Sequence, residues 1–199
     1  MKKIVIIGAS GHGKVVVDIA RLNGYDEIVF LDDNKETGKC AEYSIVGTSD
    51  MICDFDCDFF VAIGDAQARK KMIMKLDNVA TLVHPKAVVA QDVEIGKGTV
   101  IMAGAVINPG AKIGDGVIIN TCASVDHDCT VGDYVHIAVG AHIAGTVNIG
   151  ENTWIGAGAV VTNNVSIPDD CMIGAGSVVI KNIEKKGTYV GVPARWLHE

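Results

Sequence analysis

The sequence predicts two domains of different class, an α/β domain over residues 1–80 and a parallel β-helix over residues 81–199. Two observations carry this prediction. In the N-terminal part, short apolar runs alternate with helical patterns, which is typical of a small parallel sheet with crossover helices. Beyond residue 80 the apolar residues follow a fixed six-residue period, and such a period is the signature of a β-helix.

The α/β domain is expected to contain three main strands and two helices. In chain order these are a strand at 3–8, a helix at 13–25, a strand at 27–33, a strand at 55–65 and a helix at 66–76. The first strand is a continuous β-branched run that ends at Gly8, as in a buried parallel strand. Gly24 occupies the C′ position of the first helix. The second helix is expected to present four cations to solvent: Arg69, Lys70, Lys71 and Lys75.

The six-residue period runs without a change of phase from Val83 to Val179. Every sixth residue between them is Ile or Val, and a mostly compact residue follows four positions later. Each hexad is therefore expected to form a short strand with an inward Ile or Val, followed by a turn. Three hexads close one coil, so residues that are three hexads apart in the sequence should stack at the usual strand spacing of ~4.8 Å.

Charge and composition exclude several classes of function. The net charge of −7 argues against a nucleic-acid surface, which needs a basic footprint. No apolar run approaches the ~20 residues that span a bilayer, and no signal peptide precedes the first strand. The six cysteines lack zinc-ligand spacing, so we expect packed thiols in a reducing cytoplasm and no bound metal.

The segment IVIIGASGHGK joins the first strand to the first helix through Gly8, Gly11 and Gly13. Amides at the start of a helix favour an anion, and glycines let a phosphate approach closely. Asp32 and Asp33 end the next strand, where an acid often meets a ribose or a base. The alternative is a loop that only turns the chain. Since a domain this short holds only half of a dinucleotide-binding fold, one nucleotide is expected rather than two.

The motif VDHDC places His127 between two carboxylates, Asp126 and Asp128. An imidazole has a suitable pKa for general-base catalysis, and a neighbouring carboxylate orients the ring and stabilises its cation. Gly145 is three hexads further on, so it should lie directly above the imidazole and leave a notch in which a thioester could lie. Two other histidines, His84 and His198, are expected to be structural or solvated.

The hexapeptide repeats, with the closing run KKGTYVGVPARW, resemble the left-handed β-helix of hexapeptide acyltransferases. The motifs GASGHG, FLDD, AIGD and HDC together resemble the sialic acid O-acetyltransferase (NeuD) family. Within it they are similar to the PglD-type N-acetyltransferases, which acetylate UDP-linked 4-amino-4,6-dideoxy sugars in bacterial glycan biosynthesis. The resemblance covers nearly the whole chain.

This resemblance implies an acetyl-CoA-dependent enzyme and a role for each matching position. His127 is the expected general base. Asp128 is its expected partner, although this chain has Asp where the close relative has Glu, and Asp126 is the alternative. The nucleotide sugar is expected at Ser10, Gly11, His12, Asp32, Asp33 and Gly64. Acetyl-CoA is expected at His136, Gly145, Ala157 and Ala175. The resemblance also implies a homotrimer with sites at the subunit interfaces.

Three other interpretations stay open at this point. The first is an O-acetyltransferase for sialic acid or a related sugar, since the same base would serve a hydroxyl. The second is a metal lyase with histidine ligands, for which His127, His136 and His142 would be the candidates. The third is a trimer that binds without catalysis. Four C-terminal cations either hold the phosphates of CoA or form a solvated tail: Lys181, Lys185, Lys186 and Arg195.

Overall fold

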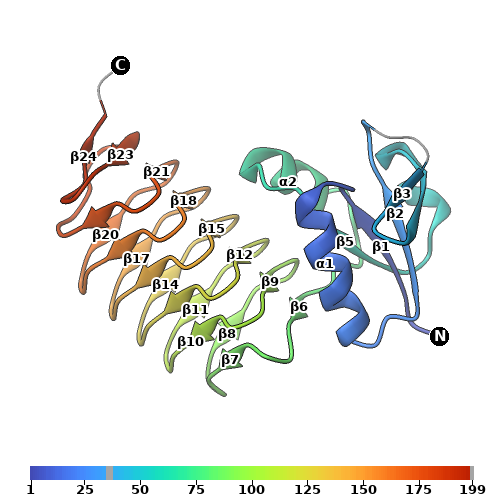
Figure 1. The fold of residues 1–199 in the computed structure, drawn as a ribbon, viewed down its shortest axis with the longest axis horizontal. Coiled ribbons are helices and arrows are strands. Elements are labelled where there is room, and N and C mark those ends of the chain that lie inside the picture. The colour runs from blue at the N-terminus through green and yellow to red at the C-terminus, as the bar shows by residue number, and fades with distance from the viewer. Residues whose placement is uncertain (35–37, 198–199) are drawn as a thin grey trace. The chain divides into compact units, whose positions relative to one another are not determined.

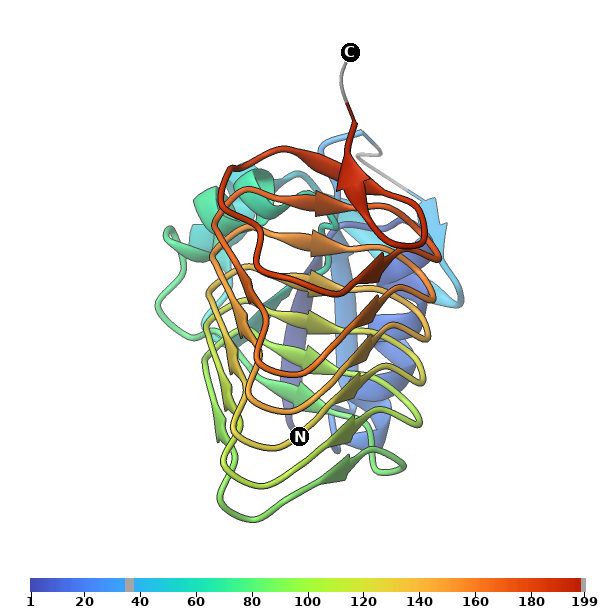
Figure 2. The ribbon, with the colours of Figure 1, turned by 90° about the vertical axis from the view of Figure 1, so that its left-hand side faces the viewer.

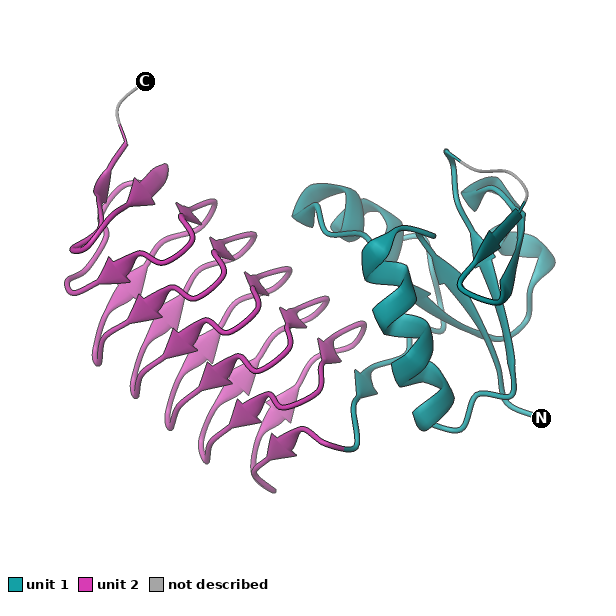
Figure 3. Cartoon of the chain, in the orientation of Figure 1, with its two compact units in different colours: residues 1–85 teal, residues 86–199 magenta. Residues whose placement is uncertain are grey.

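The computed structural model describes residues 1–34 and 38–197. The chain forms two compact units, Met1–Pro85 and Lys86–Glu199, which are coloured separately in Figure 3. The division falls slightly later in the chain than the expected boundary between residues 80 and 81. No helix in the described part of the chain is long and apolar enough to cross a membrane.

Unit 1 is built on one five-stranded sheet with the strand order β3-β4-β2-β1-β5. Its elements are β1 (Lys3–Ile7), α1 (Gly11–Leu22), β2 (Glu27–Leu31), β3 (Gly38–Cys40), β4 (Tyr43–Gly47), η1 (Ser49–Asp54), β5 (Asp58–Val61), α2 (Ala66–Ile73) and β6 (Leu82–Val83). Figure 1 labels most of them. Strand β1 lies between β2 and β5 and runs parallel to both. The three main strands and both helices agree with the sequence prediction, whereas the β3–β4 hairpin and η1 were not predicted.

Helix α1 begins at Gly11, slightly earlier than the predicted start at Gly13. Glycine is favoured at Gly13 by a close approach of two backbone segments, and at Gly24 by a positive φ. A Cβ at Gly13 would overlap the carbonyl oxygen of Gly8, so Gly13 lets the helix lie close to the end of β1. At the other end, Asn23 is the C-cap residue and Gly24 adopts φ +83°, which confirms the predicted C′ glycine.

The prediction that Arg69 faces solvent is wrong, because its side chain is completely buried. Its Nη1 donates to the carbonyl oxygens of Ile63 (2.9 Å) and Gly64 (2.7 Å) in the turn that precedes α2. A buried guanidinium needs such acceptors to offset its desolvation. The sequence did not indicate that Arg69 is buried, because it precedes Lys70 and Lys71, and a run of cations normally marks a solvated helix face.

Unit 2 is a parallel β-helix whose coils have three faces (Figure 2). The first face holds β7 (Val88–Val89), β10 (Val106–Ile107), β13 (Ser124–Val125), β16 (His142–Ile143), β19 (Val160–Val161) and β22 (Val178–Val179). The second face holds β8 (Glu94–Ile95), β11 (Lys112–Ile113), β14 (Thr130–Val131), β17 (Asn148–Ile149) and β20 (Ser166–Ile167). The third face holds β9 (Val100–Ile101), β12 (Ile118–Ile119), β15 (His136–Ile137), β18 (Trp154–Ile155), β21 (Met172–Ile173), β23 (Thr188–Val190) and β24 (Arg195–Trp196).

The coils stack in the register that the sequence period predicts. Ser124 pairs with His142 and Val125 with Ile143, three hexads apart in each case. From Ile101 to Val179, every inward Ile or Val of the period is at most 4% exposed. These ladders form the core of unit 2 and fix which residues stack above one another at each corner.

The corners between faces contain residues in the left-handed backbone region. Asp128, Thr146 and Asn164 occupy equivalent turns with φ of 58°, 60° and 61°, and Gly110 takes the same place one coil earlier with φ +75°. Glycine, Asn and Asp tolerate this region better than most residues do, which explains their frequency between the hexad positions. The turn conformation therefore places Asp128 at an exposed corner immediately after His127.

Candidate active site

His127 and Asp128 form a hydrogen-bonded pair at the corner between the first and second faces. The Nδ1 atom of His127 lies 2.9 Å from Oδ2 of Asp128, and both side chains are more than half exposed. This hydrogen bond is the main reason that the pKa of His127 is raised, and the charges of Asp126 and Asp128 act in the same direction. With Nδ1 directed at the carboxylate, Nε2 is the ring atom available to exchange a proton with a substrate.

Asp126 has a different role from Asp128. Its Oδ1 accepts the backbone N–H of His127 (2.8 Å) and the Nδ2–H of Asn108 (2.6 Å). These hydrogen bonds lower the pKa of Asp126 and keep it ionised. Asp126 therefore holds the backbone of the histidine turn, while Asp128 contacts the ring. Of the two candidate partners for the imidazole, the geometry favours Asp128.

Gly145 lies against the imidazole of His127, in the next coil. A Cβ built on Gly145 would overlap Nε2 and come within 2.6 Å of Cε1 and 3.0 Å of Cδ2. The stacking agrees with the register expected from three hexads per coil, but the expected empty notch is wrong. The ring itself occupies the space that the missing side chain leaves. Glycine at position 145 therefore gives the imidazole its position, and a thioester would have to approach the ring from its exposed side.

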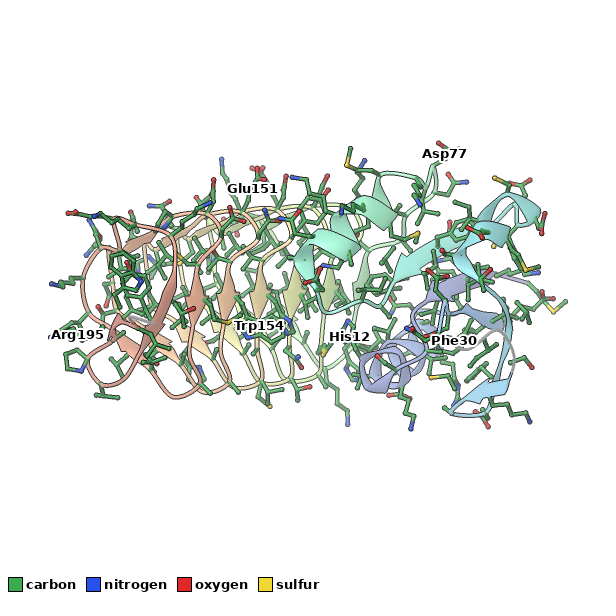
Figure 4. All side chains as sticks on the ribbon, turned by 90° about the horizontal axis from the view of Figure 1, so that it is seen from above. His12, Phe30, Asp77, Glu151, Trp154 and Arg195 are labelled. Atoms are coloured by element: carbon green, nitrogen blue, oxygen red, sulfur yellow. The ribbon has the colours of Figure 1, made fainter. Side chains whose placement is uncertain are left out.

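His136 lies on the third face, away from the corner that holds His127. It is 7% exposed, and its ring centroid is 4.1 Å from that of Trp154, which Figure 4 labels. The Nδ2 atom of Asn120 is 3.2 Å from Nε2 of His136, and Oδ1 of Asn120 accepts the backbone N–H of Thr121. Asn120 therefore orients His136, a contact that sequence spacing alone did not reveal.

Ala157 and Ala175 lie at another corner, between the third and first faces. They occupy equivalent positions in successive coils, are exposed, and each precedes a glycine with positive φ, Gly158 and Gly176. Within one chain, the four residues expected to bind acetyl-CoA thus belong to different parts of the prism. Gly145 is at the histidine corner, His136 is on the third face, and the two alanines are at the far corner. Across the described residues, no cluster of three His, Cys, Asp or Glu side chains could hold a metal.

Unit 1 has a cavity of about 330 Å³ at the carboxyl ends of β1, β2 and β5. Ten residues line it: Ile7, Gly8, Ser10, Asp32, Asp33, Asn34, Ala62, Ile63, Gly64 and Ala68. Four residues expected to contact the nucleotide sugar are among them. The other two, Gly11 and His12, are the first residues of α1, directly after Ser10. The cavity thus lies where a doubly wound sheet normally binds its ligand.

The two carboxylates of the cavity are already engaged by the backbone. Asp32 is 8% exposed; its Oδ2 accepts the N–H of Ala9 (2.6 Å) and its Oδ1 the N–H of Asn34 (2.9 Å). Asp33 accepts from the backbone N–H and the hydroxyl of Ser49, at 2.7 and 3.0 Å. Both residues thus shape the walls of the cavity, a role that the sequence analysis did not foresee.

The glycines of the cavity fall into two groups. Gly8 is required by the fold, because it has φ +107° and its added Cβ would lie 2.7 Å from the carbonyl oxygen of Ala62. An added Cβ would meet no atom within 4 Å at Gly11 or Gly64, and neither has a positive φ. The fold therefore does not require glycine at these two positions. The expectation that a ligand approaches closely at these two glycines stays a prediction.

His12 has an unusual environment for a histidine at the start of a helix. Burial, together with the positive charge of Arg69, lowers its pKa to about 4, so the ring is neutral at physiological pH. Among the described residues, its buried Nε2 has no hydrogen-bond partner. A buried polar atom without a partner is costly, and a bound ligand group would relieve that cost.

The comparisons with known proteins cover both units. Residues 3–76 match the PglD N-terminal domain, and residues 146–181 match the bacterial transferase hexapeptide repeats. The acetyltransferase domain of PglB from Neisseria gonorrhoeae is 39% identical, with a TM-score of 0.95, and the match covers 99% of this chain and all of that one. The same domain has been solved with acetyl-CoA.

Two further relatives act on nucleotide-linked amino sugars according to their names. A variant of GDP-perosamine N-acetyltransferase from Caulobacter crescentus is 35% identical with a TM-score of 0.94, over 100% of this chain and 98% of that one. The UDP-N-acetylbacillosamine N-acetyltransferase of Bacillus subtilis is 36% identical over 113 residues, and that match covers 52% of each protein. The chain thus spans about half the length of this curated relative.

The β-helix, its hexapeptide repeats and the matched structures define a hexapeptide-repeat acetyltransferase, and they confirm the predicted fold class. Within that class, the chain belongs to the PglD-type family, since it shares the N-terminal domain and matches two solved relatives over 98% or more of their solved chains.

Proposed function

We propose that this protein transfers the acetyl group of acetyl-CoA to the amine of a nucleotide-linked amino sugar, by direct transfer with His127 as general base. The observation that carries the proposal is the 2.9 Å contact of His127 with Asp128 at an exposed corner of the β-helix. The relatives support the reaction class, because they are N-acetyltransferases for a GDP-linked and a UDP-linked amino sugar.

The chemistry requires little from the protein. The sugar amine attacks the thioester carbonyl, the carbon–sulfur bond breaks, and CoA leaves as the thiolate. Nε2 of His127 takes the proton that the amine loses and returns it to the sulfur, so charge and protons balance. Asp128 stabilises the imidazolium between these steps. We assign the backbone N–H of Gly145 to the developing oxyanion.

We assign the nucleotide to the 330 Å³ cavity of unit 1. Its diphosphate would lie at the start of α1, where the amides of Gly11 and the following residues and the helix dipole favour an anion. Nε2 of His12 supplies a neutral polar contact, and Gly64 leaves space on the opposite wall. By resemblance to the PglD type, we propose UDP as the nucleotide.

We also propose a homotrimer that acts in the cytoplasm. The outward residues of the second face are polar: Glu94, Lys112, Thr130, Asn148 and Ser166. The first face instead carries four outward valines beside Ser124 and His142, and the third face carries outward Trp154 and Met172. The valines are Val88, Val106, Val160 and Val178. Val100 and Ile118 on the third face are already buried within the chain. Apolar faces of this kind suit packing between copies. A second copy would also supply the Ala157 corner to the His127 corner, which one prism holds apart.

The test is a screen of acceptors with release of the CoA thiol as readout. UDP-, GDP- and dTDP-linked amino sugars are compared with free sialic acids. We expect the enzyme to acetylate the UDP-linked amino sugar faster than the GDP-linked and dTDP-linked amino sugars and the free sialic acids. Preference for a sialic acid hydroxyl would replace this function by sugar O-acetylation, and preference for GDP or dTDP would overturn the UDP assignment.

A further inference from the structure

The cavity of unit 1 has an unusual charge for a site to which a diphosphate is assigned. Two of its lining residues, Asp32 and Asp33, are carboxylates, and none of its ten described lining residues is a cation. The whole chain is also acidic, with a net charge of −7. Because like charges repel, a bound diphosphate needs a compensating positive charge close to the cavity. The start of α1 supplies only a part of it, equivalent to about half an elementary charge.

Arg69 lies behind the wall of this cavity. It belongs to α2, and its side chain is completely buried. Because side chains on a helix point back toward its N-terminus, the guanidinium reaches the turn that precedes α2. Nη1 donates there to the carbonyl oxygens of Ile63 (2.9 Å) and Gly64 (2.7 Å), and both of these residues line the cavity. The backbone of this turn therefore separates the positive charge from the cavity.

The charge of Arg69 also acts on His12, at the start of α1. Burial is the main reason that the pKa of His12 is lowered to about 4, and the charge of Arg69 is the second. The two residues belong to different helices, so the effect of this charge extends from α2 to the first turn of α1. The proposed function assigns the diphosphate to that turn. A charge that disfavours an imidazolium there favours a phosphate anion at the same place.

We propose that Arg69 is the positive charge that compensates the diphosphate of the nucleotide sugar, although its buried side chain does not touch the ligand. This inference rests on the proposed function, because it requires that the cavity of unit 1 binds the nucleotide. Arg69 is thus a positioning residue, which holds the turn at Ile63 and Gly64 and stabilises an anion at the start of α1. A buried charge is screened less by salt than an exposed one, so Arg69 attracts an anion more strongly than a surface lysine would.

The experiment compares the binding of UDP and uridine, which share a base and a ribose and differ in the diphosphate. NMR titration gives both dissociation constants, including that of the weaker nucleoside, and GDP with guanosine forms a second pair of probes. Arg69→Gln removes the charge and keeps a donor, whereas Arg69→Lys keeps the charge and loses the planar guanidinium. Lys71→Gln is the matched control, because it removes the same charge from an exposed position on the same helix.

The readout is the ratio of the two dissociation constants, that of uridine divided by that of UDP. Damage to the cavity wall weakens both ligands and leaves this ratio unchanged, whereas loss of a compensating charge weakens UDP alone. Arg69→Gln should therefore lower the ratio about tenfold. Arg69→Lys should keep it within about threefold of the wild type at neutral pH. Lys71→Gln should leave it unchanged.

The lysine variant also tests the charge if Arg69→Gln does not fold. Burial lowers the pKa of a lysine, so the ratio in Arg69→Lys should fall between about pH 7 and about pH 9 as the amine loses its proton. The wild type should keep its ratio, because a guanidinium stays charged over this range.

An Arg69→Gln variant with the ratio of the wild type would overturn the inference, while the proposed function would stand. A ratio in Arg69→Lys that does not change with pH would count against it in the same way. If the wild type binds neither UDP nor GDP, the proposed nucleotide site fails, and this inference fails with it.

Discussion

The imidazole of His127 is bounded on both sides: Nδ1 lies 2.9 Å from Oδ2 of Asp128, and the other edge of the ring lies over Gly145. The left-handed turn at Asp128, with φ of 58°, brings its carboxylate back toward the preceding ring. One coil below, Gly110 leaves room for Oδ1 of Asp128, where an added Cβ would clash. Gly110 and Gly145 thus lie on either side of the His127–Asp128 pair, and the packing of the coils fixes the position of the imidazole.

The first prediction concerns the pH dependence of kcat. The base must be neutral, and its raised pKa places the acid limb of the profile above 6.5, the ordinary value for histidine. Asp128→Asn removes the main cause of that shift, so the acid limb should move to lower pH and plateau kcat should fall about tenfold. Asp126→Asn, which loses only a charge at a distance from the ring, should move the limb less. A larger shift for Asp126→Asn would reverse the assignment of the two carboxylates.

The second prediction concerns the space at Gly145. Gly145→Ala places a methyl group where the imidazole lies, so the ring must rotate away from the reacting atoms. We expect kcat to fall about tenfold or more, while the Kd of CoA changes less than kcat does. Stopped-flow or steady-state kinetics beside calorimetry would check this. A Gly145→Ala variant with the kcat of the wild type would show that catalysis does not depend on the position of the His127 imidazole over Gly145.

The six-residue period made the β-helix predictable, because one pattern repeated over about a hundred residues fixes both the strands and their register. The same register predicted that Gly145 stacks on His127. It could not predict the rotamer of His127, which depends on the hydrogen bond to Asp128 and decides that the ring fills the space above Gly145. The six-residue period therefore predicts where the Cα of a residue lies, but the direction of its side chain depends on local contacts.

The roles of Arg69 and Asp32 in unit 1 were not predicted, for a different reason. Arg69 looked like part of a solvated cationic run, and only the fold shows the carbonyls of Ile63 and Gly64 that bury it. Asp32 looked like a ligand contact, and its backbone partners Ala9 and Asn34 become visible only when the strand ends are brought together. Sequence spacing identifies the polar residues at a strand end, but not which of them the protein uses for itself.

The third prediction separates glycines that serve the fold from those that serve a ligand. Gly11→Ala should leave Tm within a degree or two of the wild type, since nothing meets the new Cβ, but should raise the acceptor KM about tenfold. Gly8→Ala is the contrast, because strain at φ +107° and contact with Ala62 should cost ~1–3 kcal/mol of stability. Thermal unfolding and acceptor kinetics on both variants are the measurements. Equal losses of stability would remove the argument for a phosphate at Gly11.

The fourth prediction concerns assembly. Two of the three faces of the β-helix carry outward apolar side chains, among them Val88, Trp154 and Met172. The protein should therefore be a trimer at micromolar concentration. Multi-angle light scattering should give three times the chain mass of 20.9 kDa. Trp154→Asp, on the third face, should reduce that mass if this face packs between copies. A monomeric mass for the wild type would exclude a site shared between subunits.

The central claim is that His127 takes the proton of the acceptor amine, and kcat of His127→Ala tests it most directly. Because the ring is exposed at a corner, its loss should leave the coils folded and both ligands able to bind. A histidine-to-alanine variant of the Caulobacter relative was crystallised with CoA and GDP-perosamine, which sets a precedent for such a complex. The account predicts a fall in kcat of ~10²–10⁴ with Kd for CoA and Tm nearly unchanged. A variant that keeps near-normal kcat with the true acceptor would contradict it.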